Sequence, residues 1–249
     1  MFDLVIIDEA SQCDAASAIP LLYRAKRALI IGDQQQLIHI TQLGQNRERQ
    51  IAAKWGLANT DASEFSYRDR SCFGMANLRV GASPHLLDLH FRSQAAIAYF
   101  NSERFYGGQL NICTDVDRTF DEPTVEWQHV AGDCSQGPRG RSWINREEAQ
   151  ATITGLRTLT EHLRGLGLSL GVVTPYRAQV ELLQDLANSQ LGDLARDVTI
   201  DTVNRFQGDE RDVMVFSPVV GPSMPARQIF FAANPNRINV ALSRARKRL

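Results

Sequence analysis

Short apolar runs that end in polar residues recur along this chain, and each predicts a strand of a buried parallel sheet. Residues 4–7 form the first run and residues 28–31 the second, with about twenty residues of mostly helical character between them. Two such runs joined by a helical crossover predict neighbouring parallel strands. The later runs predict strands over residues 86–93, 168–176, 198–203 and 213–219. Alternating polar and apolar residues predict a further short strand over residues 124–130.

Helical periodicity and capping residues place helices between these runs. The longest predicted helix covers residues 145–164, where Asn145 offers an N-cap and the glycines at 165 and 167 stop the helix. Other helices are predicted over residues 14–24, 47–55, 94–105, 177–187 and 237–246, and a Gly/Ser/Pro loop over residues 132–140. This alternation of strands and helices predicts a doubly wound α/β architecture.

The periodic pattern fades between residues 41 and 83, apart from the short helical piece near residues 47–55. Polar residues and scattered Gly, Asn, Asp and Ser in this stretch are typical of a connection between domains. We therefore expect two α/β units, residues 1–80 with the connection at their end, and residues 81–249.

Composition narrows the class of protein. The chain has 249 residues, 43% of them hydrophobic, and a formal net charge of -1, which fits an ordinary globular protein. No apolar run is long enough to cross a bilayer, so we expect a cytoplasmic protein with no membrane partner. The four cysteines are too scattered for a zinc site or a disulfide framework.

Candidate chemistry lies where the predicted strands end. Asp8 and Glu9 follow the first strand, and in open parallel sheets ligands bind just beyond the carboxyl ends of the strands. An aspartate there can hold Mg²⁺ on a nucleotide while its neighbour activates water. The alternative is that both acids simply cap the helix at residues 14–24. Gln36 follows the second strand and can bind a phosphate oxygen or a water, although, taken alone, this stretch is better explained as a turn rich in hydrogen-bonding side chains.

The second unit carries further polar groups of this kind. Arg92 and Arg244 can stabilise charge on a transferring phosphoryl group, and either could also be an ordinary surface arginine. Gly208 lets the backbone approach a phosphate, and Glu210 can accept a hydrogen bond from a ribose hydroxyl. The alternative is that Gly208 and Glu210 belong to a simple turn between two strands. The Thr-Pro-Tyr sequence at 174–176 offers a hydroxyl and an aromatic ring to a single strand of nucleic acid.

Taken together and in order, these segments closely resemble the motifs of superfamily 1 helicases, best those of the branch that contains nonsense-decay and replication-linked RNA and DNA helicases. The segments are Asp8-Glu9-Ala10-Ser11-Gln12 (motif II), Gly32-Asp33-x-x-Gln36-Leu37 (III), His90-Phe91-Arg92-Ser93 (IV), Val173-Thr174-Pro175-Tyr176, Phe206-Gln207-Gly208-x-Glu210 (V), and residues 239–246 (VI). The resemblance implies two parallel-sheet RecA-like (P-loop NTPase) domains, the first incomplete and the second nearly complete, with ATP and Mg²⁺ as cofactors.

The resemblance also implies residue roles. Asp8 would coordinate Mg²⁺, Glu9 would be the catalytic base for water, and Gln36 would sense the γ-phosphate. Arg92 and Arg244 resemble arginine fingers.

Glu210 resembles the ribose contact, with Gly208 beside the phosphates. Thr174 and Thr202 look like contacts to the backbone of a single-stranded DNA or RNA, and the neighbouring Pro175 and Tyr176 belong to the same element. ATP-driven opening and closing of the cleft between the domains would move the strand along.

One element of such a motor is absent from these residues. The three lysines, Lys26, Lys54 and Lys247, follow Ala, Ala and Arg, so no Gly-Lys pair exists for a phosphate-binding loop. We therefore expect the carboxyl-terminal portion of a helicase, which needs the amino-terminal part of the same polypeptide and does not hydrolyse ATP alone. The alternatives are a non-catalytic helicase-derived module that binds nucleic acid or protein, and a different P-loop enzyme such as a kinase. The sequence distinguishes neither DNA from RNA nor the direction of movement.

Overall fold

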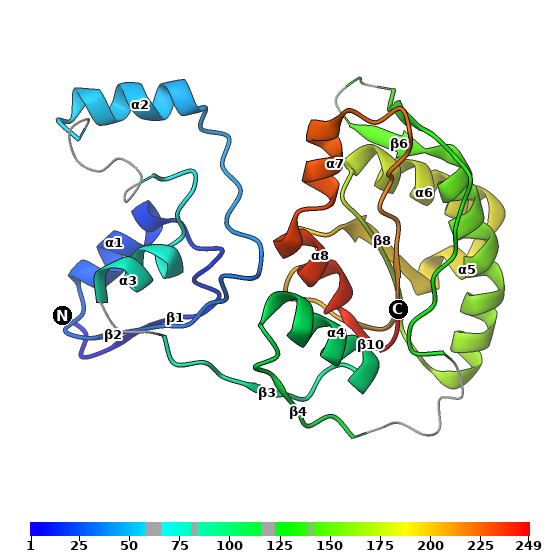
Figure 1. The fold of residues 1–249 in the computed structure, drawn as a ribbon, viewed down its shortest axis with the longest axis horizontal. Coiled ribbons are helices and arrows are strands. Elements are labelled where there is room, and N and C mark those ends of the chain that lie inside the picture. The colour runs from blue at the N-terminus through cyan, green and yellow to red at the C-terminus, as the bar shows by residue number, and fades with distance from the viewer. Residues whose placement is uncertain (58–65, 81–83, 116–122, 139, 141) are drawn as a thin grey trace. The chain divides into compact units, whose positions relative to one another are not determined.

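The computed structural model describes residues 1–57, 66–80, 84–115, 123–138, 140 and 142–249 (Figure 1). The chain forms two compact units, Met1–Leu87 and Asp88–Leu249. Among the described residues, none of the helices has the length and apolar character needed to cross a membrane.

The first unit is built on a pair of parallel strands. β1 (Val5–Ile7) pairs with β2 (Ala28–Ile30) so that Ile7 lies beside Ile30. The crossover between them is α1 (Ala15–Tyr23), and α2 (Gln45–Lys54) and α3 (Cys72–Val80) follow. Both strands and α1 confirm the predicted strand, crossover, strand unit.

The third helix of this unit was not predicted. Residues 41–83 read as a connection, yet within that stretch α3 packs on the sheet, with Cys72 buried beside Ile7, Ala10 and Ala18. Its amino end is tied to the loop after β1, because Cys72 N–H donates to Cys13 O and Phe73 N–H to Ala10 O. The helix is short and contains a glycine, so its local periodicity is weak and its stability comes from tertiary packing.

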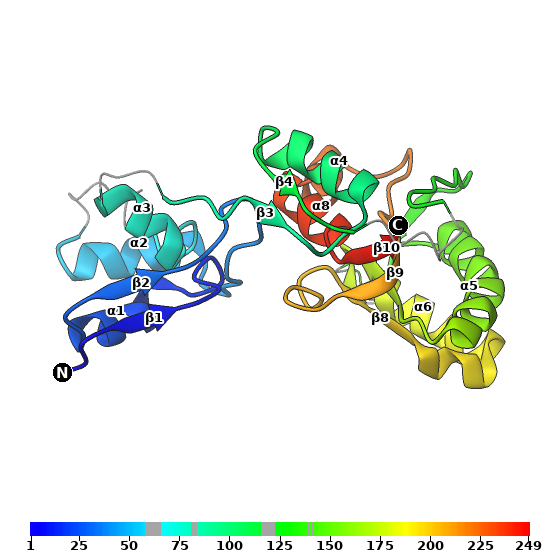
Figure 2. The same ribbon diagram turned by 90° about the horizontal axis from the view of Figure 1, so that it is seen from below.

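The second unit contains a four-stranded parallel sheet in the order β10-β9-β7-β8. Its strands are β7 (Leu170–Thr174), β8 (Val198–Thr202), β9 (Arg211–Phe216) and β10 (Ala245–Arg248). The helices are α4 (Ala95–Phe105), α5 (Arg146–Leu166), α6 (Arg177–Gln190), α7 (Ala226–Ala232) and α8 (Pro235–Leu242), with a 3₁₀ turn at Gly192–Asp197. Figure 2 shows α5 and α6 on one side of this sheet and α4 and α8 on the other. The predicted α/β class with parallel sheets is confirmed.

The core of the second unit follows from alternation in β7 and from the caps of α5. Leu170 and Val172 point to one face of the sheet and pack against the apolar side of α5 and α6. Asn145 caps α5 as predicted, with its side chain accepting from Glu148 N–H at 2.9 Å. The helix ends at Gly167, whose φ of 67° is the left-handed conformation that glycine adopts at helix ends.

Four predicted elements differ from the structure. Residues 124–130 form no regular strand, although Glu126 N–H donates to Leu249 O and Leu249 N–H donates to Thr124 O. The expected loop at 132–140 contains β5 (Cys134–Gln136), which pairs antiparallel with β6 (Trp143–Asn145). The expected helix at 237–246 ends at Leu242, because the residues after it pair with β9 as β10. Of the strand expected over residues 86–93 only β3 (Leu89–His90) forms, and it pairs in parallel with β4 (Asn111–Ile112).

Candidate functional site

A buried serine joins the two loops that leave the sheet of the first unit. Ser11 Oγ donates to Asp33 O at 2.8 Å, and Asp33 N–H donates to Ser11 Oγ at 2.6 Å. Space at this contact is tight, because a Cβ on Gly32 would lie 2.8 Å from both Ser11 Oγ and Phe73 Cγ. The loops after β1 and β2 are therefore held together as one surface. Ser11 was noted only as part of a motif, and nothing in its local sequence indicates this role.

The acidic pair sits exposed in this surface. Glu9 has a φ of 49°, an uncommon left-handed conformation for a residue other than glycine, and its N–H donates to Asp8 Oδ1 at 2.8 Å. Left-handed strain of this kind occurs often at functional sites. The cap of α1 is a different residue, Asp14, whose carboxylate accepts from Ser17 N–H at 2.9 Å. The simple reading of Asp8 and Glu9 as the helix cap is therefore wrong.

Gln36 lies in the loop after β2, at the same end of the strand pair as Asp8 and Glu9. Its Nε2 donates to Asp33 Oδ2 at 3.1 Å, which orients the amide. No cluster of three or more His, Cys, Asp or Glu side chains suited to a metal occurs in the described part of the chain. Mg²⁺ needs no such cluster, since it binds through one or two carboxylates together with substrate phosphates. An exposed Asp8 fits that donor set.

In the second unit, residues from three separate motifs meet at the amino ends of β9 and β10. Arg92 Nε lies 2.7 Å from Glu210 Oε2, and Arg246 Nε lies 3.7 Å from Glu210 Oε1. The backbone adds a further link, since Gln94 N–H donates to Arg246 O at 2.8 Å. Gly208 lies in the same loop as Glu210, is exposed, and has a φ of 85° that favours glycine. Arg92 and Glu210 are both partly exposed, so this edge is open to a ligand.

Arg244 belongs to the same edge but is folded into the protein. Its side chain is only 2% exposed; Nε donates to Val240 O at 3.1 Å and Nη1 to Asp209 O at 3.4 Å. These bonds tie the end of α8 to the loop before β9. In this conformation Arg244 holds the loop that carries Gly208 and Glu210.

The Thr-Pro-Tyr element and Thr202 lie at the opposite edge, where β7 and β8 end. Thr174 and Thr202 are register partners on neighbouring strands; Thr174 is fully buried and Thr202 partly so. Pro175 is buried too. Tyr176 is 4% exposed, its hydroxyl donates to Gln228 O at 2.7 Å, and burial raises its pKa to about 12. The ring of Tyr176 thus fills the interior and offers no free face for stacking in this conformation.

The group around Arg92 and Glu210 and the group around Thr174 and Thr202 lie at opposite ends of the parallel strands. Five residues of strand β7 span roughly 16 Å, so Glu210 and Thr174 belong to different surfaces of the second unit. The chain crosses from one edge to the other between Thr202 and Glu210, because β8 and β9 run in the same direction. The second unit therefore offers two separate surfaces, one at the amino ends of β9 and β10 and one at the carboxyl ends of β7 and β8.

A buried polar network that sequence reasoning missed supports the carboxyl edge. Gln179 is fully buried; it accepts from Asn145 N–H at 3.0 Å and donates to Ser217 Oγ at 3.2 Å. Ser217 in turn donates to Glu148, which also accepts from Val219 N–H. Burial raises the pKa of Glu148. The only sign of this role in the local sequence is that Gln179 is a polar residue next to the apolar positions of α6.

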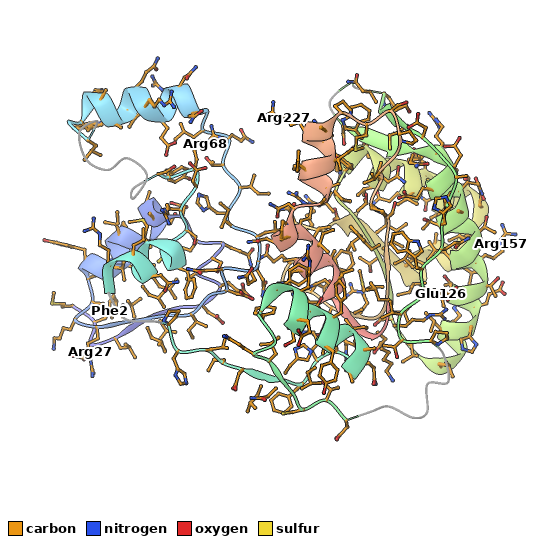
Figure 3. The ribbon with its side chains drawn as sticks, in the orientation of Figure 1. Phe2, Arg27, Arg68, Glu126, Arg157 and Arg227 are labelled. Atoms are coloured by element: carbon orange, nitrogen blue, oxygen red, sulfur yellow. The ribbon has the colours of Figure 1, made fainter. Side chains whose placement is uncertain are left out.

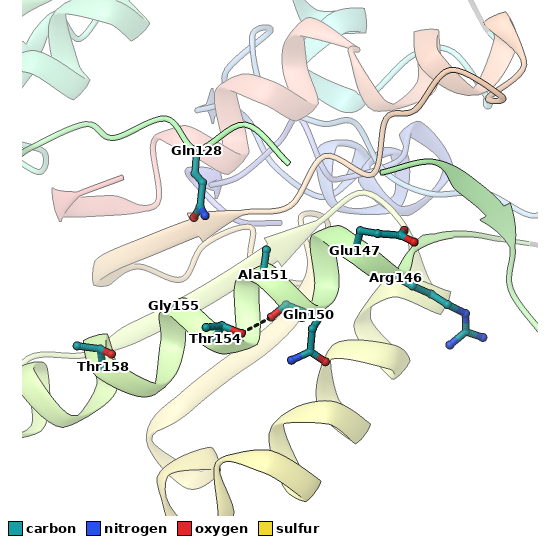
Figure 4. A pocket seen from close by; sticks show the side chains of 8 residues that line it. All are labelled: Gln128, Arg146, Glu147, Gln150, Ala151, Thr154, Gly155 and Thr158. Carbon is teal, nitrogen blue, oxygen red and sulfur yellow. Dashed lines mark hydrogen bonds between the residues drawn. The ribbon is translucent and has the colours of Figure 1, made fainter. Parts of the chain in front are cut away.

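A surface hollow with a volume of about 880 Å³ lies between Gln128 and the outer face of α5 (Figure 4). None of the predicted site residues lines it. Its lining includes Thr154, whose hydroxyl donates to Gln150 O at 2.9 Å, and few of its polar groups converge. We assign no function to this hollow.

Comparison with known proteins now places the chain in a class. Residues 68–249 match a family described as AAA domain, and residues 1–41 match a second family of that description. The chain belongs to this family, and within it to the superfamily 1 helicases.

The relatives are helicases of much greater length. Helicase SEN1 of Saccharomyces cerevisiae is 29% identical over 98% of this chain and 11% of its own length. ATP-dependent helicase upf1 of Schizosaccharomyces pombe is 31% identical, over 98% of this chain and 26% of its own. The mouse protein named 5'-3' DNA helicase ZGRF1 is 29% identical over 100% of this chain and 12% of its own. The chain thus spans a minor part of each relative.

Proposed function

We propose that this chain is part of an ATP-dependent nucleic-acid helicase or translocase, in which ATP hydrolysis drives movement along single-stranded DNA or RNA. The observation that carries the proposal is the meeting of Arg92, Glu210 and Arg246, from three separate motifs, at one edge of the second unit's sheet. An arginine pair beside an exposed glycine loop is chemistry suited to phosphate and ribose.

In the first unit, Asp8 would hold the Mg²⁺ that accompanies ATP, and the metal would neutralise charge on the phosphates. Glu9 would accept a proton from the attacking water. Gln36, oriented by Asp33, would contact the γ-phosphate or that water. The shared anchoring of both loops through Ser11 supports this division, because it fixes the acid pair relative to the amide.

In the second unit, Arg92 would meet the transferring phosphoryl group, with Gly208 near the phosphates and Glu210 near the ribose. Arg92 is paired with Glu210 in the structure, so on nucleotide binding Arg92 would exchange the Glu210 carboxylate for the phosphoryl group. Arg244 would reach a phosphate only after leaving its carbonyl partners, and its role in the present conformation is to position the loop.

At the opposite edge, Thr174 and Thr202 would approach the backbone of the single strand, with Pro175 and Tyr176 shaping the loop beside them. Thr202 is the more accessible of the two threonines. The buried ring of Tyr176 supports a positioning role for that residue.

We further propose that the 249 residues alone do not turn over ATP, because they contain no Gly-Lys pair to bind the phosphates. A steady-state ATPase assay on this chain, with and without single-stranded DNA and RNA, tests this. The expected result is no turnover above the buffer, and turnover at ordinary helicase rates would overturn it.

The general-base role of Glu9 is tested in a longer protein that contains this chain and hydrolyses ATP. Glu9→Gln should abolish turnover while ATP binding, measured with a fluorescent analogue, stays close to the parent. Asp3→Asn is the matched control, because Asp3 is an exposed acid before the opposite end of β1, paired with Lys26 at 2.7 Å. Equal loss of binding and turnover in Glu9→Gln would contradict the assignment.

A further inference from the structure

Helix α7 presents two adjacent aromatic side chains to solvent. Phe230 is 77% exposed and Phe231 is 42% exposed, whereas Ala232 beside them is buried. Single exposed apolar residues are ordinary, but adjacent aromatics on one short helix form a patch of the kind that marks binding surfaces. Nothing in the roles proposed above uses this patch.

The Phe231 half of the patch is packed from beneath, which fixes the helix that carries Phe230. The guanidinium carbon of Arg237 lies 3.8 Å from the centre of the Phe231 ring, and Arg237 also donates to Phe231 O. On the inner side, the ring of Tyr176 lies 5.4 Å from that of Phe231. A ligand that binds the exposed ring of Phe230 therefore has to order one side chain and not the helix that carries it.

The patch also belongs to the edge proposed for nucleic acid. The Tyr176 hydroxyl donates to Gln228 O in α7 at 2.7 Å, and Tyr176 follows Thr174 by two residues. Helix α7 is thereby bonded to the loop that leaves β7. A strand that passes Thr174 and Thr202 would continue toward α7.

Charge favours a polyanion over an apolar partner. Arg227 is exposed in the first turn of α7 (Figure 3). It precedes Phe230 by three residues, a spacing that puts both on one face of the helix. Residues 213–249 contain no aspartate or glutamate, and the acid bonded just before α7, Asp133, accepts hydrogen bonds from Ser223 N–H and from the Ser223 hydroxyl. An exposed aromatic face with an adjacent cation is the combination that single-stranded nucleic acids bind, through base stacking and phosphate contacts.

We propose that Phe230 and Arg227 of α7 form a stacking and phosphate-contacting platform for single-stranded nucleic acid that leaves the carboxyl edge of the sheet. One base stacks on Phe230, and Arg227 contacts a neighbouring phosphate. This inference rests on the proposed function, since it extends the same nucleic-acid surface.

The test is fluorescence anisotropy of the full 249-residue chain with labelled oligo(dT) and oligo(U). Loss of one stacked base predicts affinity lower by about 5- to 150-fold in Phe230→Ala. Phe230→Trp should bind at least as tightly as the parent, and Phe230→Leu should resemble the alanine variant, because stacking needs a ring. Tyr99→Ala on α4 is the control, removing another aromatic side chain that is 61% exposed. Far-UV circular dichroism checks that each variant is folded.

Arg227→Gln adds an independent readout. It should lower the dependence of log affinity on log salt by about 0.7, the value for one lost phosphate contact on a single strand. An unchanged slope would contradict the role of Arg227.

The remaining outcomes separate the inference from the proposed function. If the unsubstituted chain binds both oligonucleotides and Phe230→Ala binds as tightly as Tyr99→Ala, the platform proposal is refuted while the nucleic-acid function stands. If the unsubstituted chain binds neither oligonucleotide, both the platform and the nucleic-acid surface proposed at Thr174 and Thr202 of these residues are refuted. If Phe230→Ala changes only self-association in sedimentation, the patch is a contact between copies and the inference is overturned.

Discussion

The hydroxyl of Ser11 is a direct link between the loops that follow β1 and β2, and Ser11→Ala breaks that link alone. The variant removes two hydrogen bonds, of 2.8 and 2.6 Å, at a side chain that is 2% exposed. A buried backbone group that loses its partner costs about 1–3 kcal/mol. Because Asp33 is only partly buried, water replaces part of the lost hydrogen bonding, and we expect a total cost of about 1–3 kcal/mol for both groups.

Hydrogen exchange measured by mass spectrometry resolves this change locally. For a loop that opens and closes rapidly, about 1–3 kcal/mol corresponds to exchange about 5- to 150-fold faster. We expect this acceleration in peptides that cover residues 28–37. Peptides from β7 in the second unit should exchange at the parental rate.

Ser17→Ala is the matched control for Ser11→Ala. The Ser17 hydroxyl donates to the Asp14 carboxylate at 2.7 Å, but at an exposed position where water replaces it. If Ser11→Ala and Ser17→Ala accelerate exchange of residues 28–37 equally, Ser11 does not hold the two loops together. Acceleration throughout both units would instead indicate global unfolding and refute a local link.

Two further predictions concern the second unit. Gly208→Ala and Gly155→Ala both add a methyl group to open space, so only the backbone differs. Urea denaturation should show a loss of about 1–2 kcal/mol at Gly208, where φ is 85°, and a gain of about 0.5–1 kcal/mol at Gly155, inside α5; equal shifts would contradict this. Burial raises the pKa of Glu148 above its ordinary 4.5, so its contribution to stability is present at low pH and is lost as pH rises through the raised pKa. Glu148→Gln should flatten that part of the pH profile of the urea midpoint, and an unchanged profile would show that Glu148 is not responsible.

Patterns within short stretches determined much of the fold. Apolar runs predicted β1, β2, β7 and β8, because a buried strand must be apolar wherever the rest of the chain lies. Asn145 and Gly167 marked the ends of α5, because capping depends on residues a few positions apart. The order of the motifs likewise indicated the helicase class.

Elements that depend on distant partners were missed. Helix α3 exists because Cys72 packs among residues near β1, more than fifty positions earlier in the chain. β5 and β6 are regular only as a pair, and β10 replaces the last turn of a predicted helix because β9 offers it hydrogen bonds. Each signal is weak locally, and the stabilising contact lies far away in sequence.

The sequence by itself determined which residues are candidates for chemistry: the acids after β1, the amide after β2, and the arginines of the second unit. Only the tertiary structure decided which of these share a surface. It brought Arg92 to Glu210, buried Arg244 and Tyr176, and put Thr174 at the opposite edge from the glycine loop. The physical reason is that strand pairing and side-chain burial depend on the whole packed core, whereas a motif records only neighbours along the chain.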